Sequence, residues 1–127
     1  MRRIIHPGRD LVEETPRITI ADLRAWSFIP GPGEERTGIV TLSRDGKEAG
    51  RTQATVCVDG PGSFVRFDYL LGDERKPVRR EHGLEFFPCH FGGHRFYFRC
   101  GYCTRRVTAL YPSGGYYACR HCHRLAY

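Results

Sequence analysis

Four cysteines near the C-terminus restrict the folds open to this chain more than any other feature. Residues 100–122 read CGYCTRRVTALYPSGGYYACRHC, so two C-x-x-C pairs are separated by a spacer of 15 residues. A structural zinc ion takes four ligands in a tetrahedron, and two such pairs at the ends of short hairpins supply four thiolates. The spacing therefore predicts a zinc ribbon with one structural Zn²⁺, bound by Cys100, Cys103, Cys119 and Cys122.

The spacer favours a ribbon over two redox motifs. It reads as a strand over residues 106–111, a turn over 112–115 and a second strand over 116–118. A redox C-x-x-C is expected within a βαβ pattern, and neither pair has one around it.

The other two cysteines carry less information. Cys57 and Cys89 fall in expected strands, where a free cysteine behaves as a small buried apolar residue. The segment CHFGGH also places His90 and His94 beside Cys89, but three ligands in a short loop are fewer than a structural zinc site takes. A metal role for these three residues stays an open alternative.

The chain length and the N-terminal sequence limit the classes of protein to which this chain can belong. The 127 residues suffice for one domain, with or without a small appendage. No apolar run approaches the length of a membrane span, and the N-terminal MRRIIHPGRDLVEE lacks the apolar centre of a signal peptide. We expect a cytoplasmic protein without a membrane partner, in a reducing compartment where disulfides are rare.

The chain divides into an arm over residues 1–17, a β-rich domain over 18–93 and the ribbon over 94–127. The arm shows no periodicity and contains helix-breaking prolines. The β-rich domain begins with a short helix over 19–26, TIADLRAW, which Thr19 caps and in which Asp22 is the acidic residue of a capping box. Its inner face is expected to carry Ile20, Leu23 and Trp26.

After residue 36 the apolar residues alternate, which predicts strands. Asp45-Gly46 marks a hairpin turn, and further turns are expected at 59–62 and 72–77. The expected strands cover 37–43, 49–58, 63–71, 83–89 and 94–100. The predicted fold is mainly β, a small α+β protein: an antiparallel β-meander of about five strands with the helix packed on one face.

The positive charge is concentrated in the last third of the chain. Residues 1–85 hold 14 Lys and Arg and 14 Asp and Glu, whereas residues 86–127 hold six Arg, no Asp or Glu and 11 of the 15 Phe and Tyr. Arginines interleaved with aromatics can pair with phosphates and stack on bases. Two observations weigh against this: small zinc domains bury aromatics around the metal, and a zinc tetrathiolate carries a charge of about −2.

The arginines and aromatics nevertheless favour nucleic acid over other partners. We expect the ribbon to bind nucleic acid, DNA rather than RNA. The binding candidates are Arg105, Arg106, Arg120, Arg124, His121, His123, Tyr102, Tyr116 and Tyr117. The alternative is a protein partner. The salt dependence of the affinity distinguishes the two kinds of partner, because phosphate binding weakens steeply with ionic strength.

An enzyme with a small-molecule substrate is not expected. A catalytic zinc keeps an open coordination position, and four cysteines close it. No Asp or Glu follows Glu85 to act as a base beside the metal. The chain also lacks Walker, Rossmann and GxSxG motifs.

The last 40 residues resemble a known group of sequences. PCHFGGHRFYFRCGYCTRRVTALYPSGGYYACRHCHRLAY is similar to the C-terminal module of small uncharacterised proteins that phages, prophages and integrative elements of proteobacteria encode. The match runs through residues 90–93, the four cysteines, Arg105 to Val107, Leu110, Tyr111 and Leu125 to Tyr127. It departs at the N-terminus, where such proteins often carry a Gly/Arg-rich tail, and after Tyr127, where they often continue into a basic helix.

The resemblance implies a mobile-element origin in a bacterial host cell. A nucleic-acid-binding ribbon would there be a regulator of the phage or element. The alternative becomes a phage factor that inhibits or modulates a host enzyme, such as RNA polymerase or an anti-phage defence complex.

Overall fold

The chain folds around a six-stranded antiparallel sheet. The structure, a computed structural model, describes residues 15–90, 92–112 and 115–125. Strands that follow each other along the chain lie side by side in this sheet. They are β2 (Glu34–Arg44), β3 (Lys47–Val58), β4 (Phe64–Leu71), β5 (Lys76–Pro88), β6 (His94–Arg99) and β7 (Arg106–Val107). This order confirms the predicted mainly β fold with an antiparallel meander.

Short turns set the register of the meander. Between β2 and β3, Asp45 and Gly46 have φ angles of 54° and 77°, and Arg44 pairs with Lys47 across them. Two positive φ angles in a two-residue loop are the geometry of a type I′ turn, which Asp-Gly adopts readily. The turn between β3 and β4 is a short 3-10 helix, η2 (Gly60–Gly62). Both turns are confirmed where the sequence predicts them.

A second, two-stranded sheet joins the N-terminal part of the described chain to the segment after β7. β1 (Ile18–Thr19) pairs antiparallel with β8 (Ala109–Leu110), and the Ile20 N–H donates to the Thr108 carbonyl at 3.0 Å. Ile18 and Leu110 are fully buried. This pairing places the N-terminal part of the domain directly against the spacer of the ribbon.

The α-helix of the described residues, α1 (Ile20–Ala25), begins where the sequence predicts. The Thr19 hydroxyl accepts the Asp22 N–H at 3.0 Å, which satisfies one of the free amides of the first turn. Leu23 is fully buried against the sheet. The expected place of Trp26 on the inner face is wrong: it is the C-cap residue and is 44% exposed, because the helix ends before its face would turn inward again.

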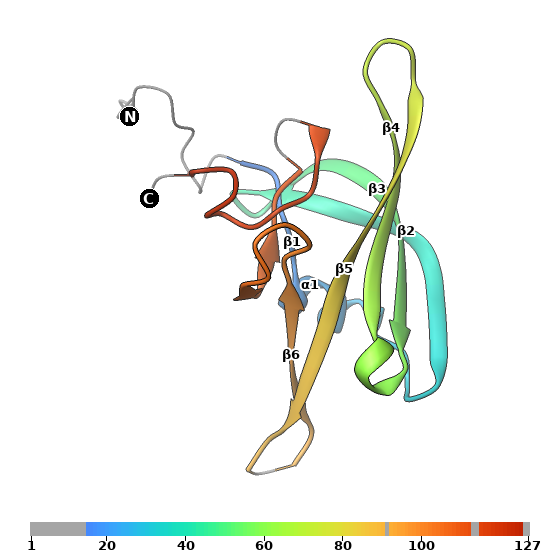
Figure 1. Ribbon diagram of the computed structural model, residues 1–127, viewed down its shortest axis with the longest axis vertical. Helices are drawn as coiled ribbons and strands as arrows, with labels where there is room; N and C mark the ends of the chain where they lie inside the picture. The colour runs from blue at the N-terminus through green and yellow to red at the C-terminus, as the bar shows by residue number, and fades with distance from the viewer. Residues whose placement is uncertain (1–14, 91, 113–114, 126–127) are drawn as a thin grey trace.

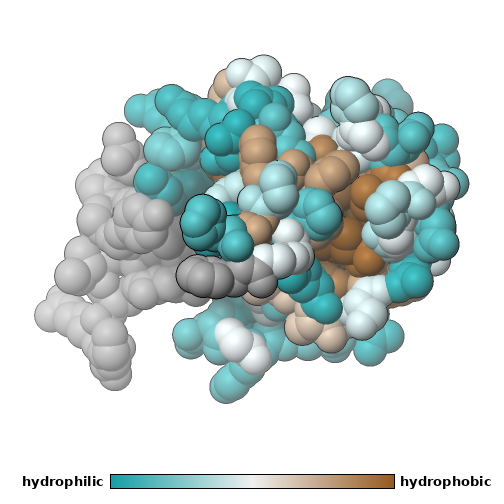
Figure 2. Space-filling view, turned by 90° about the horizontal axis from the view of Figure 1, so that it is seen from below, coloured by the Kyte–Doolittle hydropathy of each residue, from teal (hydrophilic) through white to brown (hydrophobic). Residues whose placement is uncertain are grey.

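The sheet curls around α1 and β1, so the core lies on its concave side (Figure 1). Apolar residues come to the surface in one hollow of the face seen from below, where hydrophilic residues surround them (Figure 2). The buried core consists of Ile18, Ile20, Leu23, Val40, Leu42, Ala54, Val56, Val58, Val65, Phe67, Leu84, Phe98, Leu110 and Tyr117. Residues from the spacer of the ribbon thus share one core with the sheet.

The sheet continues across the expected domain boundary at 93/94. β5 and β6 pair from Gly83 with Arg99 to Pro88 with His94, and β7 extends the sheet beyond them. The first cysteine pair therefore follows directly from a strand of the main sheet. Of the expected arm, residues 1–14 lie outside the described residues; Arg17 exchanges two backbone hydrogen bonds with Ser43 at the end of β2.

Candidate metal centre

The four cysteines of the two C-x-x-C pairs converge at one point. Their sulfur atoms all lie within 4.8 Å of one another. Cys100 Sγ is 3.8 Å from Cys122 Sγ, and Cys103 Sγ is 3.4 Å from Cys119 Sγ. Tetrahedral zinc–sulfur bonds of about 2.3 Å place sulfurs about 3.8 Å apart, whereas a disulfide needs about 2.05 Å. The cysteines are positioned to hold one metal ion.

Local backbone structure fixes each pair of ligands. Cys100 follows the last residue of β6, and its N–H donates to the Arg105 carbonyl at 2.9 Å. The Thr104 N–H then donates back to the Cys100 carbonyl at 2.9 Å and closes the first knuckle. In the second knuckle the His123 N–H donates to the Cys119 carbonyl at 3.2 Å. These backbone hydrogen bonds set the shape of each knuckle.

The pKa values of the thiols in the cluster differ. Burial raises the pKa of Cys103, but the Arg105 N–H and the neighbouring thiols outweigh it and lower the pKa to about 6. Burial raises the pKa of Cys122, and the thiols of Cys103 and Cys100 raise it further. A metal ion between the sulfurs stabilises all four thiolates, so its binding releases protons.

The ligand set selects the class of metal. Four sulfurs in a tetrahedron suit zinc or iron, and they leave no open position for substrate. Cys100 and Cys119 are buried, and the Cys119 N–H points to Cys100 Sγ at 3.5 Å. The four cysteines could thus supply all four ligands of one ion. The described residues contain no other cluster of three metal ligands, so Cys89, His90 and His94 do not come together.

A buried histidine of β5 supports the first knuckle. The Gly101 N–H, between the two cysteines, donates to His82 Nδ1 at 2.9 Å. A Cβ at Gly101 would lie 2.8 Å from the Glu81 carbonyl oxygen and 3.2 Å from His82 Nδ1, so only glycine allows this approach. His82 is 2% exposed, and burial lowers its pKa to about 4. It is therefore neutral at pH 7, with its proton on Nε2, for which no described residue is a hydrogen-bond partner.

The lowered pKa of His82 predicts a pH dependence of stability. The unfolded chain takes up a proton near pH 6.5 and the folded chain only near pH 4, so this contribution is complete above pH 6.5 and is lost as the pH falls to about 4. His82→Asn keeps an acceptor oxygen near the position of Nδ1 but does not titrate. Between about pH 7.5 and about pH 5, the wild type should lose about 2 kcal/mol more stability than His82→Asn.

Urea unfolding of both metal-loaded proteins at the two pH values measures this difference. Thiolate protonation affects both proteins alike, so it cancels in the comparison. Equal losses in the two proteins would show that His82 does not stay neutral in the folded state.

The arginines of both knuckles act on one histidine. The pKa of His121 is lowered mainly by burial, and in second place by the charges of Arg120 and Arg105. Both guanidinium groups are therefore close enough to act on the same ring, although they belong to different knuckles. Arg124 follows in the same turn, where its N–H donates to the His121 carbonyl at 3.2 Å. We call Arg105, Arg120, Arg124 and His121 the basic ribbon surface.

Arg106, one of the predicted binding residues, lies apart from the basic ribbon surface, in the main sheet. It belongs to β7 and pairs with Arg99 of β6. Its Nε donates to Glu85 at 3.1 Å, and Arg99 donates to both oxygens of the same carboxylate at 2.9 and 3.0 Å. Glu85 therefore neutralises part of the charge of these two arginines. This pairing is invisible in the sequence because it joins β5 with β6 and β7.

The aromatic residues among the binding candidates lie in two different environments. Tyr102 is 49% exposed, and its ring lies 5.2 Å from that of Tyr116. Tyr116 in turn lies 4.5 Å from His123, whose Nε2 is 2.6 Å from the Tyr111 carbonyl oxygen. These three side chains form a half-exposed aromatic row beside the metal centre.

The prediction that Tyr117 is a binding residue is wrong, because its side chain is buried. It is 3% exposed and stacks on Phe67 with ring centres 4.2 Å apart and an angle of 10°. Burial raises its pKa to about 12. It anchors the spacer to the sheet, with the nearby Tyr69 hydroxyl donating to the Gly115 carbonyl at 3.0 Å.

Two further properties of the chain give no information about its function. In the part of the chain that the structure describes, no helix is both long and apolar enough to cross a membrane. Compared with models of protein families, with curated proteins and with solved structures, the chain matches none of them.

Proposed function

We propose that this protein is a zinc-ribbon protein that binds nucleic acid, DNA in the first place, through its basic ribbon surface. The observation that carries this proposal is that the cysteine cluster brings together the two knuckles that carry Arg105 and Arg120, whose charges both lower the pKa of His121. A surface rich in arginine attracts phosphates, and arginine's planar fork suits them. Residues 86–127 hold six Arg and no Asp or Glu.

The metal in this proposal is one structural Zn²⁺. Four thiolates close the coordination sphere, so the ion supplies folding free energy and not chemistry. By fixing both knuckles at one point, it would hold Arg105 and Arg120 on the same surface. We propose no enzymatic activity for the site.

The distribution of arginines in the last third of the chain supports a phosphate partner. Glu85 takes up charge from Arg99 and Arg106. The other arginines of residues 86–127 are Arg95, Arg105, Arg120 and Arg124, three of which are in the basic ribbon surface. With the resemblance of the last 40 residues to phage and mobile-element proteins, we propose a regulatory role in such an element, in the cytoplasm of a bacterial host.

A protein partner is the second candidate, and one feature favours it. β2 is the first strand of the sheet, and among the described strands only β3 pairs along it, apart from the bridge between Arg17 and Ser43. Ile39, in the middle of β2, is 64% exposed. An open strand edge with an exposed apolar residue can pair with a strand of another protein, here a host enzyme or a defence complex.

Charge reversal on the ribbon should weaken DNA binding. Arg105 and Arg124 are exposed, so Arg105→Glu with Arg124→Glu should leave metal content and fold intact. We expect affinity for DNA to fall by more than about tenfold at low salt, and the slope of log K against log salt to decrease by about 1 to 2. Gel-shift titrations at two salt concentrations measure both quantities.

A matched control uses two exposed arginines outside the ribbon sequence. Arg44 and Arg75 are exposed at hairpin turns, and Arg75 shares with Arg124 a positive φ angle, 53° against 56°. Arg44→Glu with Arg75→Glu makes the same change in net charge. Equal losses in the two double variants would mean that net charge alone, and not the ribbon surface, governs binding.

A further inference from the structure

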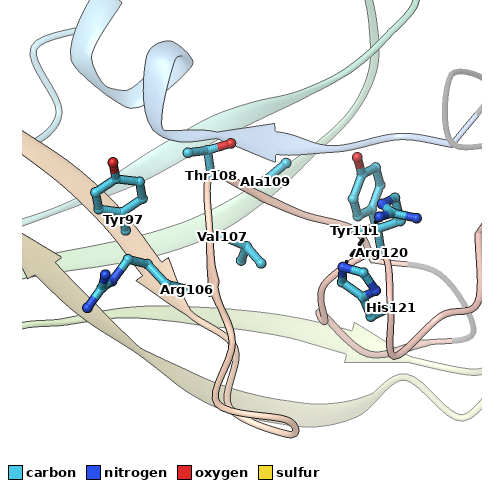
Figure 3. A pocket seen from close by; sticks show the side chains of 8 residues that line it. All are labelled: Tyr97, Arg106, Val107, Thr108, Ala109, Tyr111, Arg120 and His121. Carbon is cyan, nitrogen blue, oxygen red and sulfur yellow. Dashed lines mark hydrogen bonds between the residues drawn. The ribbon is translucent and has the colours of Figure 1, made fainter.

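A recess of about 290 Å³ lies beside the basic ribbon surface, between the β7–β8 segment and the second knuckle. Tyr97 and Arg106 lie at one end, and Tyr111, Arg120 and His121 lie at the other (Figure 3). Thr108 lies on the wall between them, and none of the described residues that line the recess has a carboxylate. The recess therefore joins cationic and aromatic groups at both ends with a neutral centre.

Its size limits what can enter. Pockets for small organic molecules begin at about 300 Å³, so the recess admits a unit no larger than about one nucleotide. The bases of a duplex are stacked and paired inside the helix, and only an unpaired base can swing out into such a pocket. The recess therefore fits a single strand and not a duplex.

Arg106 makes the first end a rigid platform. Its guanidinium carbon lies 4.6 Å from the centre of the Phe87 ring and 5.7 Å from that of Tyr97. The bond from its Nε to Glu85 at 3.1 Å fixes the group in this position and offsets its charge. A flat guanidinium that is already held in place can stack on a base with little loss of side-chain freedom.

The second end is suited to the phosphate. Arg120 and His121 face the recess together, with Arg120 Nη2 3.4 Å from His121 Nε2, the contact dashed in Figure 3. Arginine forks bind phosphate oxygens in pairs.

We propose that this recess binds one nucleotide of a single strand, with its phosphate at Arg120 and His121 and its base stacked on the Arg106 guanidinium. This inference rests on the proposed function of nucleic-acid binding and adds to it a preference for single strands. It also gives Arg106 a role that differs from the predicted one: a stacking surface inside the recess in place of a phosphate contact at the tip.

Thr108→Trp tests the recess without changing charge. The Thr108 side chain is exposed and lines the wall, so tryptophan there should fill the space while the backbone bond from Ile20 to the Thr108 carbonyl remains. Gln53→Trp is the matched control, because Gln53 is also exposed but lines a different recess, on β3 to β5. The probes are a fluorescent oligo(dT) of about 12 nucleotides and a duplex of the same length.

We expect Thr108→Trp to weaken oligo(dT) binding by about tenfold and to leave duplex binding within about twofold, with unchanged metal content and salt slope. Gln53→Trp should bind both probes as the wild type does. If Thr108→Trp binds oligo(dT) like the wild type, the recess is not the site. If the wild type binds the duplex but shows no preference for the single strand, this inference fails and the proposed function stands; if it binds neither probe, both fail.

Two further measurements on the wild type make the test independent of how the variant folds. Oligo(dT) should shift the backbone amide signals of Val107, Thr108 and Arg120 in NMR spectra, and unchanged signals there would contradict the proposal. Free dTMP at the same nucleotide concentration should not displace oligo(dT). Displacement at comparable concentration would assign the recess to a free nucleotide and overturn the single-strand assignment.

Discussion

Replacement of Cys100 by serine should remove the metal and unfold the ribbon. Cys100 is buried and follows β6 directly, so its loss affects both the metal centre and the end of the main sheet. Serine is a poor ligand for a soft thiolate site, and a structural zinc contributes on the order of 10 kcal/mol to the folding of small zinc domains. Elemental analysis should find one zinc per wild-type chain and almost none in Cys100→Ser, and thermal unfolding should lose its cooperative transition.

The two cysteines outside the cluster supply the controls. Cys57 and Cys89 are half-buried and free. Cys57→Ala and Cys89→Ala should keep one zinc per chain, and each should cost no more than about 1–2 kcal/mol of stability. Full metal retention in Cys100→Ser, or metal loss in either control, would show that the ligands are assigned wrongly. Iron in place of zinc would overturn only the identity of the ion.

Tyr117→Ala should destabilise the fold by about 3–5 kcal/mol, the range for loss of a buried aromatic ring. Its ring stacks on Phe67 and lies 5.2 Å from the ring of Tyr69, so removal leaves a cavity between the ribbon and the sheet. Tyr117→Phe keeps the ring and should cost much less. Urea unfolding of the metal-loaded proteins measures these differences.

Tyr102→Ala distinguishes a surface aromatic from a core one. Because Tyr102 is half-exposed, we expect its loss to cost less than about 1 kcal/mol. If Tyr117→Ala were as stable as the wild type but bound DNA less tightly, Tyr117 would be a contact residue, as the sequence predicts, and its packing would not matter.

The sequence predicts the metal centre well because the signal is local. A C-x-x-C knuckle brings two ligands together within one turn, and only the distance between knuckles depends on the rest of the fold. The Asp45-Gly46 turn is equally local, since two positive φ angles require residues that tolerate them. The helix cap at Thr19 belongs to the same class of features.

The long β5 strand shows where the local signal is too weak. The sequence predicts a strand from Gly83, but β5 begins at Lys76, because charged residues over 79–81 hide its alternation. Val78, His82 and Leu84 nevertheless lie on one face, and that spacing of two was the available signal for a buried histidine. Read in this way, His82 belongs to the core and becomes a candidate support of the knuckle.

Tyr116 and Tyr117 show what the sequence cannot decide. Neighbouring residues of an extended segment point in opposite directions, so one of the two must face the sheet. Which one does so depends on how the spacer packs on β4, through Phe67 and Tyr69. The ion pairs of Glu85 with Arg99 and Arg106 likewise depend on three strands being adjacent.

A salt titration of DNA binding by the zinc-loaded wild type tests the proposed function without any mutation. Arg105, Arg120 and Arg124 can neutralise about three phosphates, so log K should fall linearly with log salt, with a slope of about −2 to −3. The binding should disappear when a chelator removes the metal, because the two knuckles then no longer hold their arginines together. A wild-type protein that shows no binding at low salt, or an affinity that does not change with salt, would contradict nucleic-acid binding through this surface.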